Sequence, residues 1–169
     1  MERIPELVKH LETEMEKILQ VWHEQSKHIK IASIEDTMKQ VYTHGDLGAC
    51  VVITYLRSSC VTESHQFKVA VYPKKPFIDD PTYYTFLELK SLYMDMPQYV
   101  ENLIKKLTPP YFQILSYEQE EIKRKFMAKL YERSGHFFEC VINEMASGEK
   151  KIPVYFGEEM GELTRIGDI

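Results

Sequence analysis

The chain has 169 residues, 44% hydrophobic and 28% charged, a composition typical of one globular domain with a sizeable core. Its net charge of −5 disfavours broad electrostatic binding to nucleic acid or to an anionic membrane. Glutamates interrupt the N-terminal segment and no apolar run reaches membrane-spanning length, so we expect a cytoplasmic protein with neither a signal peptide nor a membrane anchor.

The cysteines predict neither a disulfide framework nor a zinc site. Cys50, Cys60 and Cys140 are odd in number and widely spaced, and no two form a C-x-x-C pair. Free thiols of this kind are typical of a reducing compartment. The histidines show no H-E-x-x-H spacing, so we expect no metal and no other cofactor.

The segment 5–25 predicts an amphipathic helix that begins at Pro5, where a missing N–H costs nothing. Its apolar residues recur at spacings of three and four and form an a/d heptad stripe. Such a stripe either faces the core of its own protein or forms a seam with a partner helix. In the second case the interface residues are Val8, Leu11, Met15, Ile18 and Trp22.

The segment 33–45 fits a short helix better than a strand, although the sequence leaves both readings open. Ile34, Met38 and Val41 recur at helical spacing. Ser33 resembles the first residue of a capping box, which favours a helix that begins there.

Two β-rich runs, 49–56 and 67–72, flank a polar segment and predict an antiparallel hairpin. A turn centred near Cys60 would pair Thr54 with Phe67 and set mostly β-branched and aromatic residues opposite one another. Apolar side chains occur on both faces of the first run, which predicts a central strand that is covered on both sides.

The second half of the chain reads mainly as helix. Residues 83–96 fit no single period, whereas Pro97 is expected to begin a helix. A longer helical pattern follows Ser116, and Gly135 leaves open whether it is one helix or two. The tail 152–169 is expected to form a hairpin at the sheet edge or to lie on a partner.

Together these elements predict a single α+β domain over residues 1–169. A small antiparallel β-sheet centred on the hairpin would pack against the N-terminal amphipathic helix and the C-terminal helices. The hairpin itself would then be scaffold, and any function would lie at its two ends or on the helices around it.

No pattern in the chain assembles a catalytic site, because a nucleophile elbow, a P-loop and a dinucleotide-binding motif are all missing. Cys60 and His65 lie in one turn segment, which supplies neither walls nor oxyanion donors. The leading hypothesis is therefore a non-enzymatic protein-interaction module: a regulator, inhibitor or adaptor with a protein partner, able to associate as a homodimer. The supply of Tyr and Met favours it, because these residues serve interface cores and adaptable contacts.

Two other classes of function remain as alternatives. A small-molecule-binding protein or enzyme would need a pocket between sheet and helices, lined by Tyr55, Tyr72, Tyr83, Tyr84 and His65. A hairpin that follows helices is also similar to the wing of winged-helix DNA-binding domains. The acidic net charge makes nucleic acid an unfavourable partner.

Overall fold

The computed structural model describes residues 5–26, 29, 32–46, 48–56, 58–62, 64–108, 114–145 and 151–169, without the side chains of 5–8, 60 and 61. Its helices are α1 (Pro5–Ser26), α2 (Ala32–His44), α3 (Ser59–Thr62), α4 (Lys90–Tyr93), α5 (Met96–Leu107) and α6 (Ser116–Met145). Its strands are β1 (Cys50–Tyr55), β2 (Gln66–Tyr72), β3 (Tyr83–Glu88), β4 (Pro153–Glu158) and β5 (Leu163–Asp168). The α+β class is confirmed, and in the described parts of the chain no helix combines the length and apolar content needed to cross a membrane.

The five strands form one mixed sheet in the order β3-β2-β1-β4-β5. The predicted hairpin is its centre, and β1 is the middle strand, buried along its whole length. All neighbours are antiparallel except β1 and β4. The sheet is therefore not purely antiparallel as expected, because the chain returns through α5 and α6 before β4, and a crossover of that length permits parallel pairing.

The predicted register of the hairpin is wrong by one residue. Thr54 lies opposite Lys68, and Phe67 lies opposite Tyr55. The connection contains the helical turn α3 in place of a tight turn, so turn geometry does not set the register. The observed pairing gathers the larger apolar side chains of both strands on one face: Val51, Ile53, Tyr55, Phe67, Val69 and Val71.

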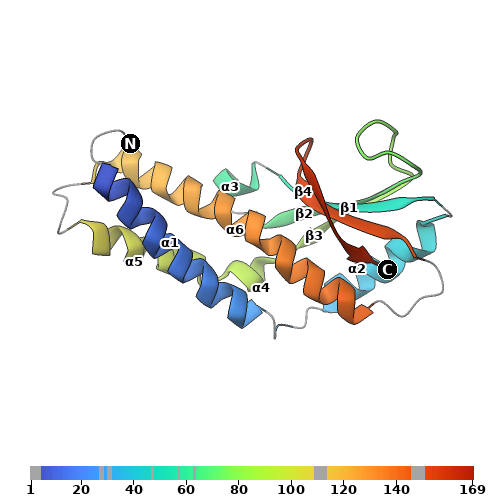
Figure 1. The fold of residues 1–169 in the computed structure, drawn as a ribbon, viewed down its shortest axis with the longest axis horizontal. Helices are drawn as coiled ribbons and strands as arrows, with labels where there is room; N and C mark the ends of the chain where they lie inside the picture. The colour runs from blue at the N-terminus through green and yellow to red at the C-terminus, as the bar shows by residue number, and fades with distance from the viewer. Residues whose placement is uncertain are drawn as a thin grey trace.

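The helices cover that face, which we call the inner face. α2 packs against β2 and β3, whereas α6 packs against β4 and β5. Figure 1 shows α1 and α6 running side by side, with α5 next to them at the end of the molecule away from the sheet. One continuous apolar core joins the helices to the sheet.

The sequence left open whether the segment near Ser33 is helix or strand and whether one helix or two follow Ser116. The structure answers both questions. The segment that begins near Ser33 is helical, with Ile34, Met38 and Val41 buried. α6 is a single helix of 30 residues that continues through Gly135. The helix expected from Pro97 is also present as α5.

Candidate functional site

The side of the sheet opposite the helices, which we call the outer face, carries a buried cluster, a polar network and two exposed aromatic side chains. On the three strands β1, β2 and β3 it is formed by Cys50, Val52, Thr54, Gln66, Lys68, Ala70, Tyr72, Tyr84, Phe86 and Glu88. The register places these residues on one face because paired residues of neighbouring strands point to the same side.

The centre of the outer face is covered by the protein itself. Cys50, Val52, Ala70 and Tyr72 form a small buried cluster. The partly buried side chains of Phe77, Tyr155 and Leu163 pack against it. These contacts explain why β1 is buried on both sides although helices cover only one, as the sequence predicts for this strand.

A polar network ties the β4–β5 hairpin to the outer face beside this cluster. The Glu159 carboxylate accepts hydrogen bonds from Lys68 Nζ at 2.7 Å and from Thr54 Oγ1 at 2.5 Å. Burial alone would lower the pKa of Lys68, but the hydrogen bond and the negative charge of Glu159 outweigh it and raise that pKa. Lys68 therefore carries its charge in a half-buried ion pair.

The part of the outer face formed by β3 is uncovered. Tyr84 is 57% exposed and Phe86 is 51% exposed, and their rings meet edge to face with centroids 6.0 Å apart. Lys68 Nζ lies 5.9 Å from the centre of the Tyr84 ring. Ile78, in the preceding loop, is a further exposed apolar side chain. Exposed aromatic side chains next to a cation are the kind of surface that protein interfaces favour.

The two edge strands of the sheet differ in how they are protected. β5 carries the charged pair Arg165–Asp168, and a register shift interrupts its pairing with β4 between Val154 and Tyr155. Charges and bulges of this kind discourage further strand pairing. β3 pairs with β2 through six consecutive residues without a shift, and it contains no Pro or Lys. Its one charged residue, Glu88, lies at its C-terminal end, so β3 is the less protected edge in the described part of the chain.

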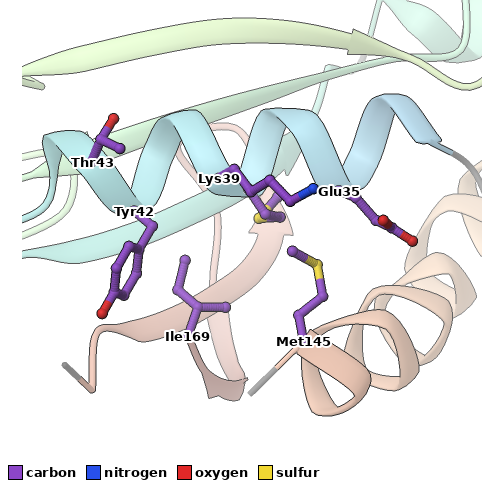
Figure 2. Close-up of a pocket in the computed structure, with 7 residues that line it drawn as sticks. Glu35, Lys39, Tyr42, Thr43, Met145 and Ile169 are labelled. Carbon is purple, nitrogen blue, oxygen red and sulfur yellow. The ribbon is translucent and has the colours of Figure 1, made fainter. Parts of the chain in front are cut away.

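A groove of about 460 Å³ lies on the other side of the molecule, between α2 and the C-terminal end of α6. Figure 2 shows Met145 of α6 and Ile169, which follows β5, facing α2. Met38 is buried and contributes to the apolar lining. Among the described residues, the polar side chains that line the groove come from α2: Glu35, Lys39, Tyr42 and Thr43.

A second hollow, of about 390 Å³, lies where α6 meets the β4–β5 hairpin. Tyr55 and Phe156 form its apolar wall, and Glu132, Glu158 and Glu162 line it with carboxylates. Among the described residues, no three His, Cys, Asp or Glu side chains gather closely enough to hold a metal ion.

The candidate interface residues of the first helix lie mainly in the core. Leu11, Met15 and Trp22 are at most 3% exposed, and Ile18 packs against the same core. The side chain of Val8 lies outside the described residues. α1 packs against α5 and α6, so the heptad stripe already has its partner within the chain.

The predicted Tyr pocket is not assembled as one site. Tyr55 lies on the inner face of β1, whereas Tyr72 and Tyr84 lie on the outer face. Tyr83 packs against α2, where its ring stacks on His44 at 4.2 Å and its hydroxyl donates to the Gln40 side chain. The expected common cavity is therefore divided by the sheet.

His65 ends the α3 connection but is a core residue and not a surface one. It is 8% exposed, and its Nδ1 lies 2.9 Å from the Tyr131 hydroxyl. Its ring also stacks on Tyr93 at 4.8 Å. The side chain of Cys60, the other member of the turn segment, lies outside the described residues. His65 thus holds α6 to the sheet.

The thiol of Cys50 is a packing group. Burial, together with the negative charge of Asp79, raises its pKa. A raised pKa leaves less of the reactive thiolate near neutral pH. Cys140 lies half-buried on α6, and neither thiol forms a disulfide.

Sequence reasoning missed Phe86 as an exposed aromatic and missed Met38, Met145 and Ile169 as groove residues. The aromatic and β-branched residues from Tyr83 to Phe86 are typical of a strand, but only the strand order shows that this strand is an edge. Comparisons with protein families, with curated proteins and with solved structures gave no match.

Proposed function

We propose that this protein is a non-enzymatic protein-interaction module that binds its partner along β3. The observation that carries the proposal is the coincidence of the less protected sheet edge with two exposed aromatic side chains, Tyr84 and Phe86. An open edge offers backbone hydrogen bonds to an added strand, and the side chains beside it supply affinity and selectivity.

The surrounding charges support a protein partner more than a nucleic acid. The outer face near β3 carries Lys68 with Glu159 and Lys90 with Glu88, so each cation is paired with a carboxylate. A nucleic-acid site would instead need a cluster of Lys and Arg side chains that can neutralise phosphates. β1 and β2 occupy the middle of the sheet, so this hairpin does not project as a wing for DNA.

Quantitative affinity capture from the native host tests the proposal. The bait would be the wild type, Phe86→Asp, or Tyr117→Asp as a matched control. Tyr117 is 60% exposed on α6, far along the chain from β3, so its variant makes the same chemical change elsewhere. We expect partners to be lost with Phe86→Asp and retained with Tyr117→Asp, in proteins with identical circular dichroism. Equal partner sets for all three baits would refute the proposal.

The groove between α2 and α6 favours a second candidate function, the binding of a small apolar molecule. Its apolar lining with polar groups on one side has the form of a ligand site. A fluorescent probe such as anilinonaphthalene sulfonate should bind there, and Met145→Glu should abolish the signal. Met94→Glu, which changes an exposed methionine outside the groove, should leave it intact. Equal fluorescence in both variants would exclude this site.

A further inference from the structure

We infer that the strand added at β3 is the β3 strand of a second copy of this chain, paired antiparallel about a two-fold axis. This inference rests on the proposed function and names the partner. The product is a symmetric dimer in which two five-stranded sheets join into one.

The backbone of β3 determines which residues can pair. Leu89 N–H donates to the His65 carbonyl at 3.0 Å, which continues the β2–β3 ladder. Hydrogen-bonded pairs alternate in an antiparallel ladder. The odd-numbered residues of β3 therefore direct their backbone groups toward β2. Tyr84, Phe86 and Glu88 direct theirs toward the free edge.

The side chains of β3 form complementary pairs with those of a second β3 when the two-fold axis passes midway between the Thr85 residues of the two copies. In that register Tyr84 of each copy lies opposite Phe86 of the other, and both pairs are on the outer face. Tyr83 then lies opposite Leu87 on the inner face. Aromatic and apolar cross-strand pairs stabilise a sheet, and here each pair occurs twice. Centring the axis on Phe86 would instead set Tyr84 opposite Glu88.

The helices on the inner face are compatible with the same arrangement. Because both copies keep their outer faces on the same side, the two α2 helices flank the seam on the inner side, where α2 packs against β3. They add contact area that a strand pair alone lacks.

Site-directed disulfide formation tests the register. Thr85 would face Thr85 of the second copy in a non-hydrogen-bonded pair, whose Cα atoms lie about 4.5 Å apart, within disulfide range. Thr85→Cys should form a covalent dimer under mild oxidation, at least ten times faster than Phe86→Cys, which faces Tyr84 in this register. Both variants would be made with Cys60→Ser, and the Cys60→Ser parent is the control for the remaining thiols.

Sedimentation equilibrium of the full chain tests the assembly without added cysteines. Wild type should show a reversible monomer–dimer equilibrium, and Phe86→Lys should weaken it at least tenfold, whereas Tyr117→Lys should not. A monomer at every concentration, or equal crosslinking by Thr85→Cys and Phe86→Cys, would overturn the inference. If capture still depended on Phe86, the proposed function would stand with a different protein at the edge.

Discussion

Tyr93 is the residue at which the helices and the sheet meet. It is fully buried, its ring stacks on both Trp22 and His65, and its hydroxyl lies 2.6 Å from Ser134 Oγ. Ser134 Oγ donates to the Leu130 carbonyl, so the Tyr93 hydroxyl is the donor in their contact. Burial raises the pKa of Tyr93.

This raised pKa predicts a loss of stability at alkaline pH. Tyr93 stays neutral in the fold, whereas in the unfolded chain a tyrosine ionises at about pH 10. Its contribution is therefore complete below pH 10 and decreases above it, by up to about 1.4 kcal/mol per pH unit. Tyr93→Phe should cost about 1 kcal/mol at pH 7, where it removes one buried hydrogen bond, and should flatten the decline above pH 10.

Urea unfolding from pH 7 to pH 11 measures both effects. Tyr117→Phe is the control, because Tyr117 is exposed and should follow the wild-type curve throughout. A Tyr93→Phe curve parallel to wild type above pH 10 would contradict the assigned role of this hydroxyl.

At the scale of elements, α6 depends on a glycine for its contact with the sheet. A Cβ atom added to Gly135 would lie 2.9 Å from the Phe156 ring of β4. That ring cannot easily retreat, because it packs among Tyr55, Phe67 and Phe138 and is 5% exposed. The glycine that weakens the helical pattern in sequence is thus a point where the helix leaves no room for a side chain against β4.

Gly135→Ala therefore has two opposing effects on stability, one on helix propensity and one on core packing. Alanine gains about 1 kcal/mol of helix propensity, but overpacking a core typically costs about 1–3 kcal/mol. We expect a net loss of about 1 kcal/mol in the free energy of unfolding by urea denaturation. In a Phe156→Leu background, which leaves room, the same substitution should be stabilising. Stabilisation in both backgrounds would show that the ring is free to move.

Elements with a strong local period were predictable from the sequence, and contacts between distant elements were not. The spacing of Ile34, Met38 and Val41 is visible within one segment, and the structure places them together in the core. The hairpin strands were predictable from their β-branched and aromatic residues and from the polar segment between them. Their register was not, because it depends on α3 and on which face the helices cover.

The candidate surfaces were hidden from sequence for a related reason. Phe86 is exposed because β3 is last in the sheet, and strand order is a property of the whole chain. The groove brings Glu35 of α2 to Ile169 at the other end of the sequence. The a/d stripe of α1 has the same pattern whether it forms a core or a dimer seam, and only its packing on α5 and α6 separates the two.

At the scale of the whole molecule, α6 and one continuous core connect the helical end to the sheet, so we expect them to unfold together. Leu11 is 2% exposed on α1, and Leu11→Ala should cost about 2–4 kcal/mol. In a cooperative domain this loss reaches the sheet as well. Trp22, the single tryptophan, reports on the helical end, where its Nε1 donates to the Leu92 carbonyl at 3.1 Å.

Two probes then decide whether the chain is one folding unit. Trp22 fluorescence and amide hydrogen exchange at Val51 and Ile53 of β1 should lose the same free energy in Leu11→Ala. Ile78→Ala, which truncates a 77% exposed side chain, should change neither. A shift in fluorescence with unchanged exchange in β1 would mean that the α1 end opens separately from the sheet. The single-domain prediction would then be wrong, because the two ends would share one core but would not unfold together.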